Sequence, residues 1–161
     1  MKWQLQSLNN SCGPATIKNL LMLYGVNIKE TTLIKRMGLK KIDGTPEEKI
    51  YQILDYYNIK YKKKKIYKSW DKFYDIIIKC LKQSKPILLY TECEGHIVLL
   101  SSVINEKIQV INSGLDKSHL STLITEDNIK KLAYSINTYS FQIYYTAIFI
   151  ETPTSLLDQV E

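Results

Sequence analysis

The spacing of apolar residues changes about halfway along this chain of 161 residues, and no other feature constrains its fold as strongly. In the first half, apolar residues recur every three or four positions, which is typical of amphipathic helices. After Pro86 they form short runs of β-branched and aromatic residues, which favour strands. The length corresponds to about one domain. Helices followed by antiparallel strands therefore predict a single α+β domain.

Recognisable start and stop residues place three or four helices before the first strand. We expect them at 14–24, at 32–37, from a capping box at 45–48, and from Ser69 to just before Pro86. Proline is tolerated in the first turn of a helix, so Pro46 is expected at the first helical position of the third one. Gly25 and Gly38 are expected to end the first two.

Four strands are expected in the second half, at 86–92, 95–103, 107–112 and 141–152. Asn105 and Glu106 form a tight turn between the second and the third of these strands. A helix that begins near Thr125 precedes the last strand. The predicted arrangement is amino-terminal helices packed on a carboxy-terminal antiparallel sheet.

The formal net charge of +6 rests on lysine, because Arg36 is the only arginine among 22 basic residues. Base recognition and bidentate phosphate contacts favour the arginine fork, so nucleic-acid binding is not expected. The uncharged stretch 132–150 is nearly long enough to cross a membrane, but polar residues interrupt it every few positions. No membrane span is therefore expected. The first residues carry no secretory signal, which predicts a cytoplasmic protein.

Three cysteines, Cys12, Cys80 and Cys93, make an odd number in a chain without an export signal, so a disulfide framework is not expected. The chain has no Cys-x-x-Cys pair, and its two histidines are His96 and His119. Neither a metal site nor a cofactor is expected from this set. Any thiol chemistry would come from one cysteine acting singly.

Cys12 lies at the start of the first expected helix. Unpaired backbone N–H groups and the positive end of the helix dipole favour a thiolate there. Burial as a small apolar residue is the more common role of an intracellular cysteine, and the position alone does not overturn that interpretation.

His96 and Asn112 are expected on neighbouring strands, His96 at the start of one and Asn112 at the end of the next. Residues equidistant from a hairpin turn face each other. The two residues lie on one face if the turn is centred near residue 104. Together with Cys12 they give the nucleophile, base and orienting amide of thiol hydrolases. Gln6 could form an oxyanion hole with the Cys12 N–H.

Gln6 and the blocks 10–15, 95–99 and 110–112 resemble the bacteriocin-processing, double-glycine leader peptidases, a family of papain-like cysteine peptidases. The resemblance implies a papain-like domain over 1–152 and a short tail over 153–161. It implies a peptide or protein substrate cut after small residues such as Gly-Gly. The roles that it implies are Cys12 as nucleophile, His96 as general base and then acid, Asn112 as the residue that orients His96, and Gln6 as oxyanion donor.

Two positions depart from the usual pattern of that family. Asn112 and Ser113 stand where Asp and Pro are usual, and Ser11 stands where an acidic residue is usual. Asparagine can hold the imidazole tautomer but adds no negative charge beside the imidazolium. Two alternatives stay open: a non-catalytic peptide-binding protein of the same fold, and a thiol-dependent amide transferase or deamidase.

Three further residues, Gly13, Cys93 and Gly95, are candidates for lining the cleft because they lie beside Cys12 or His96 in the sequence. Residues 60–68 form the densest run of charge and could face acidic substrates or a lipid surface. The simpler interpretation is a solvated strand or loop with Tyr61, Ile66 and Tyr67 packed inward.

Overall fold

The computed structural model describes residues 2–8, 10–40, 44–114 and 120–154, and the statements below refer to these residues. The helices are α1 (Cys12–Leu23), α2 (Glu30–Met37), α3 (Glu47–Tyr56), α4 (Trp70–Lys82) and α5 (Glu126–Ala133). The strands are β1 (Tyr61–Tyr67), β2 (Ile87–Thr91), β3 (His96–Ile104), β4 (Lys107–Ile111), β5 (Ser121–Ile124), β6 (Ser135–Ile136) and β7 (Ile143–Ile150). All the helices and strands that we predicted are present. Most of the tail predicted over 153–161 lies outside the described residues.

Local signals explain most helix boundaries. Gly25 follows the last residues of α1 with φ of +70°, and Gly38 ends α2 with φ of +63°, a conformation that glycine adopts without steric cost. At the start of α4, the Ser69 side chain accepts the N–H of Lys72 at 3.4 Å, as expected of a capping residue.

The capping box predicted at the start of α3 is wrong. Pro46 is the residue before the helix, with ψ of 142°, and α3 has no side-chain cap. Thr45 instead packs against Gly13 of α1: a Cβ built on Gly13 would lie 2.3 Å from Thr45 Oγ1. The contact between α1 and this loop has therefore overridden the local capping signal.

Six strands form one antiparallel sheet in the order β1-β7-β2-β3-β4-β5, and β6 pairs with β7 outside this path. The strands β5 and β6, which are short, were not predicted. The run 60–68 contains the edge strand β1. Its predicted inward packing is wrong for Ile66, which is 60% exposed.

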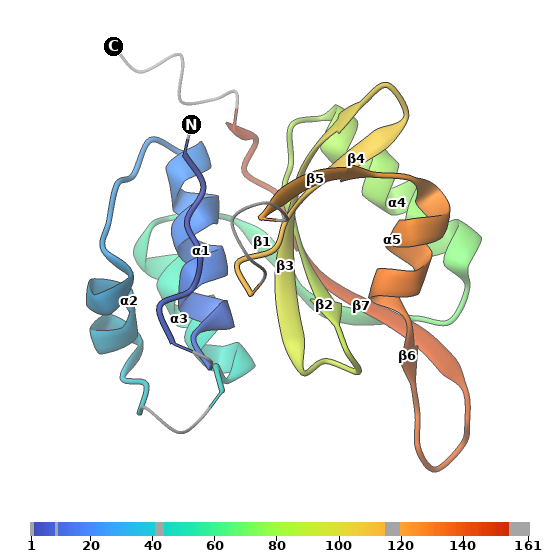
Figure 1. Ribbon diagram of the computed structural model, residues 1–161, viewed down its shortest axis with the longest axis horizontal. Helices are drawn as coiled ribbons and strands as arrows, with labels where there is room; N and C mark the ends of the chain where they lie inside the picture. Colours follow the sequence, from blue (N-terminus) through green and yellow to red (C-terminus); the bar gives the residue numbers. More distant parts are fainter. Residues whose placement is uncertain (1, 9, 41–43, 115–119, 155–161) are drawn as a thin grey trace.

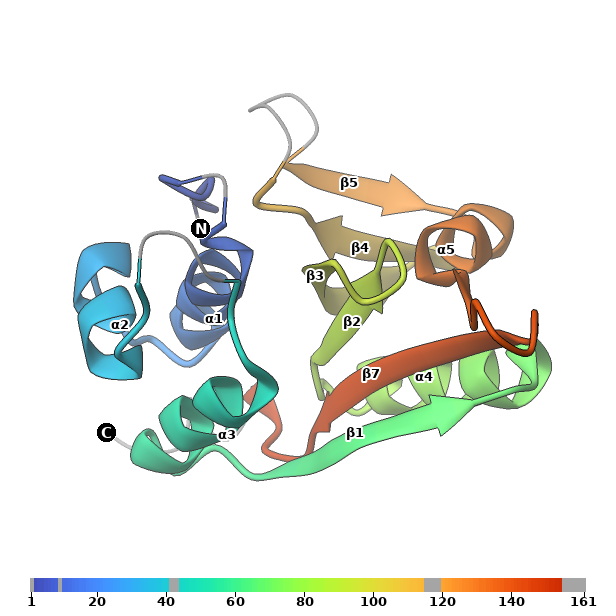
Figure 2. The same cartoon turned by 90° about the horizontal axis from the view of Figure 1, so that it is seen from below.

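Helices cover both faces of the sheet (Figures 1 and 2). Helices α1, α2 and α3 pack with alternate residues of the central strands in one apolar cluster. Helices α4 and α5 pack with the other residues of those strands in a second cluster. This is the alternation that a sheet buried on both faces requires. The predicted α+β class, with amino-terminal helices on an antiparallel sheet, is confirmed.

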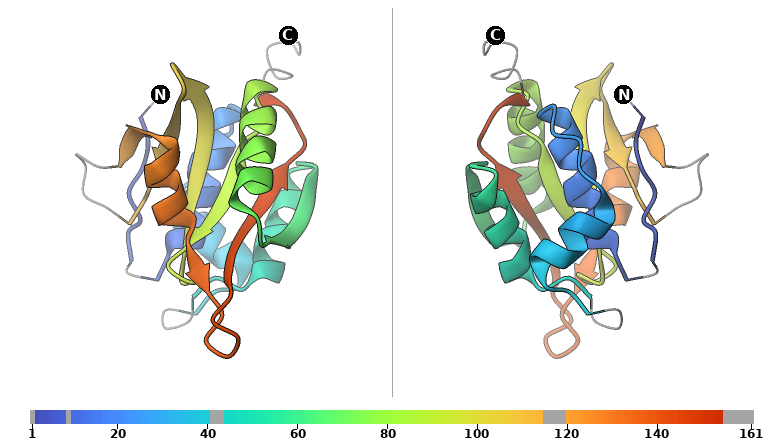
Figure 3. Two further views of the ribbon diagram at one scale, coloured as in Figure 1. Left: turned by 90° about the vertical axis from the view of Figure 1, so that its right-hand side faces the viewer. Right: turned by 90° about the vertical axis from the view of Figure 1, so that its left-hand side faces the viewer.

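The hairpin that joins β6 and β7 extends beyond the body of the molecule (Figure 3). No helix among the described residues is long and apolar enough to cross a membrane.

The turn between β3 and β4 lies at Asn105 and Glu106, which have φ of +47° and +62°. Two central residues with positive φ match the right-handed twist of a hairpin. Ile104 pairs with Lys107, which confirms the turn predicted at Asn105 and Glu106, but the turn is not centred near residue 104, the condition under which His96 and Asn112 were expected to share a face.

A β-bulge compensates for this different position of the turn. The register between β3 and β4 shifts between Leu100 and Ser102, so that Leu99 pairs with Ile111 beyond the bulge. In that register, the residue of β3 that lies opposite Asn112 is an even number of positions from His96. Residues an even number of positions apart in a strand point to the same face. The bulge therefore brings His96 and Asn112 to one face.

Candidate active site

Cys12 is the first residue of α1, where the backbone N–H groups of Cys12 and Gly13 have no acceptor within the helix. Ser11 precedes it, is 3% exposed, and closes a tight loop with Leu8. The Ser11 hydroxyl donates to the Leu8 carbonyl at 3.0 Å and accepts the Leu8 N–H at 3.1 Å. Ser11 thus holds the chain immediately before the thiol without a negative charge.

His96 is the first residue of β3 and lies between Cys12 and Asn112. Its Nε2 is 2.8 Å from Asn112 Oδ1, and the Cys12 thiol has the largest influence on the pKa of the ring. Because Oδ1 accepts, Nε2 carries the proton, which leaves Nδ1 for the thiol. The Oδ1 atom also accepts the N–H of Gly114 at 3.2 Å, which fixes the amide.

The pKa of His96 is raised above its ordinary value. The hydrogen bond with Cys12 is the largest cause, burial opposes it, and the hydrogen bond with Asn112 and the charges of Cys12 and Glu92 add to it. The surroundings therefore favour the imidazolium form, which is the proton donor that a thiol hydrolase needs for the leaving group.

Thr16 ties the helix of the thiol to the strand of the imidazole. It lies one turn after Cys12, is 1% exposed, and donates its hydroxyl to the carbonyl of Ile97 at 3.1 Å. Ile97 is adjacent to His96. This buried hydrogen bond fixes α1 against β3 at the point where the two reactive side chains meet.

Gln6 reaches the same region from the amino-terminal segment. Its backbone N–H donates to the carbonyl of Ser113 at 2.9 Å, and its Nε2 donates to the carbonyl of Leu8 at 2.8 Å. A Cβ on Gly114 would lie 2.9 Å from His96 Cε1 and 3.4 Å from Gln6 Oε1. A residue without a side chain is therefore required between the imidazole and this amide.

Two buried polar residues, which the sequence did not reveal, hold the segment that carries Gln6. Asn19, with no exposed surface, accepts the N–H of Gln4 and donates to its carbonyl, both at 2.9 Å. Glu30 is 7% exposed and accepts the N–H of Ser7 at 3.1 and 3.2 Å through its two oxygens. Both look like ordinary helix residues in the sequence, and only their burial indicates their role.

The candidates for lining a cleft lie near the reactive groups but in different surroundings. Gly13 follows Cys12 and is covered by Thr45. Cys93 is exposed, in the turn between β2 and β3, where residues 92–94 have φ of +52°, +52° and +70°. Gly95 ends this turn, and a Cβ there would lie 3.1 Å from the Glu92 carbonyl. Cys80 is remote from them on α4, and His119 lies outside the described residues.

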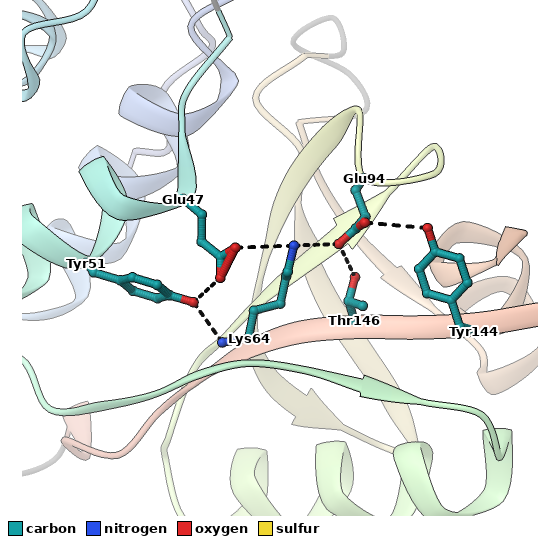
Figure 4. A network of polar contacts seen from close by, with 6 residues as sticks. All are labelled: Glu47, Tyr51, Lys64, Glu94, Tyr144 and Thr146. Carbon is teal, nitrogen blue, oxygen red and sulfur yellow. Dashed lines mark hydrogen bonds and ion pairs between the residues drawn. The ribbon is translucent and has the colours of Figure 1, made fainter. Parts of the chain in front are cut away.

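A polar network beside this turn links the two layers of the molecule (Figure 4). Lys64 Nζ lies 2.7 Å from Glu94 and 3.3 Å from Glu47 at the start of α3. Burial lowers the pKa of Lys64, but the two carboxylates outweigh it and raise the pKa overall. Glu94 lies two residues before His96, so the network holds the turn from which His96 emerges. Its other members are Tyr51, which donates to Glu47 and accepts the Lys64 N–H, and Tyr144 and Thr146, which donate to Glu94.

No group of three or more histidine, cysteine or acidic side chains within the described ranges is arranged to hold a metal ion. The groups with reactive chemistry that the structure brings together are those of Cys12, His96 and Asn112, with Gln6 nearby.

Comparison with solved structures shows that domains of known peptidases share this fold. The peptidase domain of Streptococcus ComA, a bi-functional ABC transporter of a quorum-sensing pathway, superposes with a TM-score of 0.62 at 16% identity, covering 93% of this chain and 96% of that one. A double glycine motif protease from an AMS/PCAT transporter, solved in complex with the leader peptide, gives a TM-score of 0.62 at 14% identity, covering 94% and 91%. A C39-like peptidase from Bacillus anthracis gives a TM-score of 0.62 at 12% identity, covering 94% of each chain.

These matches confirm the predicted papain-like fold. No curated protein matches the chain significantly by sequence. The model of the Peptidase_C39 like family matches residues 1–143, which is most of the chain. The chain therefore belongs to the Peptidase_C39 like family.

Proposed function

We propose that this protein is a cysteine peptidase in which Cys12, His96 and Asn112 act together. The observation that carries the proposal is the position of the His96 ring, whose Nε2 lies 2.8 Å from Asn112 Oδ1 and whose pKa is influenced most by the Cys12 thiol. Membership of a peptidase family supports a peptidase function in general. The roles of the individual residues are inferred from their geometry.

In the proposed reaction the Cys12 thiolate attacks the carbonyl carbon of the scissile peptide bond. The carbon–nitrogen bond breaks as the His96 imidazolium gives its proton to the leaving amine. A water molecule then attacks the thioester, His96 takes one proton from it, and the acid product leaves. Asn112 keeps the His96 proton on Nε2 and directs Nδ1 toward the sulfur throughout.

The oxyanion of each tetrahedral intermediate is proposed to rest on the backbone N–H of Cys12 and on the side chain of Gln6. One such donor contributes about 10² to 10³ in rate. An amide nitrogen carries two hydrogens, so the bond from Gln6 to Leu8 is compatible with this role. Asn19 and Glu30 would act as positioning residues, because they hold the chain on either side of Gln6.

The proposed substrate is a peptide cut after small residues, as in a double-glycine leader. The support is the resemblance of the sequence blocks and the fold shared with a double glycine motif protease that was solved with a leader peptide.

Mass spectrometry of peptide digests made in ¹⁸O water tests this proposal. We expect cleavage after Gly-Gly, with one ¹⁸O atom in the new carboxyl group, and loss of cleavage in Cys12→Ala. A matched peptide with valine in place of the last glycine should be cut at least about tenfold more slowly. Cleavage that survives in Cys12→Ala contradicts the mechanism. A product linked to an added amine indicates the transferase, and tight binding without turnover indicates the non-catalytic alternative.

A further inference from the structure

The face of the sheet opposite α1 carries a lysine-rimmed groove that the proposed peptidase reaction does not use. The groove has a volume of about 500 Å³ and lies between β1, α4 and the end of β7. Figure 2 shows α4 alongside β1 and β7. Four lysines line it: Lys62, Lys65, Lys79 and Lys85. The acidic residue among its lining is Glu151, 3.5 Å from Lys62, so positive charge is in excess.

An irregularity in β1 aims two of these lysines into the groove. Lys62 pairs with Phe149 and Lys65 with Ala147, and the register shifts between the two pairs. Phe149 and Ala147 belong to the apolar cluster on the α4 side. Residues three apart in a regular strand point to opposite faces, so the shift is what places both lysines on the same face.

Lysines on an edge strand commonly prevent pairing with other chains. That explanation does not extend to Lys79, which is on α4, or to Lys85, which is in the loop after it. Nor does it explain why lysines from different segments converge on one groove. Burial raises the pKa of the Cys80 thiol and the charge of Glu151 adds to the rise, whereas the charges of Lys85, Lys62 and Lys79 oppose it. Three ammonium groups from three segments therefore act on one thiol that lines the groove.

Apart from Gln83 and the thiol of Cys80, the remaining lining is apolar and aromatic. It includes Tyr67, Ile76 and Phe149. A volume of this size is typical of small-molecule sites, which combine an apolar wall with a few polar groups. Lysine binds phosphate as a point charge and does not need the fork geometry of arginine. The combination fits an anion that carries an apolar part, which a single inorganic ion does not have.

We propose that this groove binds a phosphate ester that carries an apolar group, as in a nucleotide or a phospholipid headgroup. The ammonium groups would contact the phosphate, and the side chains of Tyr67, Ile76 and Phe149 would contact the apolar part. The bound ligand would cover the thiol of Cys80. The proposal does not depend on peptidase activity, because the groove lies on the opposite face of the sheet from Cys12.

Alkylation of Cys80 provides the test. The Cys12→Ser/Cys93→Ser variant keeps Cys80 as its single thiol, and its rate of reaction with iodoacetamide is measured at constant ionic strength. We expect adenosine diphosphate or phosphatidylglycerol vesicles to slow the reaction in a saturable way, and inorganic pyrophosphate or phosphatidylcholine vesicles to have less effect. Protection by the nucleotide identifies a small-molecule site, and protection by the anionic vesicles alone identifies a lipid headgroup.

Lysine variants in the same background locate the site. Lys62→Gln/Lys79→Gln should weaken the protection at least about tenfold. The control variant Lys29→Gln/Lys35→Gln should leave it unchanged, because it changes two exposed lysines, one just before α2 and one within it. Protection is taken as the ratio of rates with and without ligand, so a change in the reactivity of the thiol itself cancels. The proposal is overturned if no phosphate ester protects Cys80, if pyrophosphate protects equally well, or if both lysine variants behave alike.

Discussion

Exchanging Asn112 for aspartate changes the charge beside His96 while keeping the shape of the side chain. Asn112→Asp places a carboxylate oxygen where the amide oxygen now lies, 2.8 Å from Nε2. Two opposite charges about 4 Å apart attract by about 4 kcal/mol at an effective dielectric constant of about 20. Desolvation of the carboxylate offsets roughly half of this. The remaining 2 kcal/mol or so corresponds to about 1.5 pH units.

The sign follows from which form of His96 is stabilised. A neighbouring negative charge favours the imidazolium, so the pKa of His96 rises further in Asn112→Asp. The alkaline limb of kcat/KM reports the loss of the proton that the leaving amine requires. We therefore expect this limb to move up by about 1.5 pH units. In Asn112→Ala it should move down, because a hydrogen bond that raises the pKa of His96 is lost.

The assay is hydrolysis of a fluorogenic peptide by the three proteins between about pH 5 and pH 10. NMR titration of the His96 ring in a His119→Gln background measures the same shifts without turnover. Alkaline limbs that coincide, or that move in the same direction in both variants, would refute the assigned role of Asn112.

Three further substitutions test how the fold holds the site. Thr16→Val leaves the Ile97 carbonyl without its 3.1 Å hydrogen bond and should lower the free energy of unfolding by about 1 to 3 kcal/mol in urea, whereas Thr16→Ser should cost less. Gly13→Ala places a Cβ 2.3 Å from Thr45 Oγ1, and this clash should outweigh the gain in helix propensity of about 1 kcal/mol. The melting temperature should therefore fall, and the added substitution Thr45→Gly should restore part of the loss. Lys64→Met leaves two carboxylates facing each other without a cation between them, so it should lower the free energy of unfolding in urea, and less so at high salt, where the repulsion is screened. An equal cost at low and high salt would contradict this.

The positions of Cys12, His96 and Asn112 in the fold were predictable from local sequence patterns. Cys12 starts a helix whose periodicity and Gly25 stop are clear, and His96 and Asn112 lie in runs with a strong strand preference. Local patterns of this kind depend on short-range backbone preferences, which the sequence expresses directly.

The features that bring those residues together depend on packing and were not predictable. The shift between Leu100 and Ser102 has no local signal, although it decides which face Asn112 shares. Thr45 and Pro46 carry a strong capping signal, which the contact with α1 overrides. Asn19 and Glu30 hold the segment that carries Gln6 because they are buried, and burial depends on the whole fold.

The pairing of Cys12 with His96 is the central claim, and the rate of Cys12 alkylation tests it most directly. The intact protein and His96→Gln are treated with iodoacetamide at pH 6, and labelling at each cysteine is followed by mass spectrometry. An imidazolium beside the sulfur favours the thiolate, so Cys12 should react at least about tenfold faster in the intact protein, while Cys80 and Cys93 react alike in both. Equal rates at Cys12 would contradict the account.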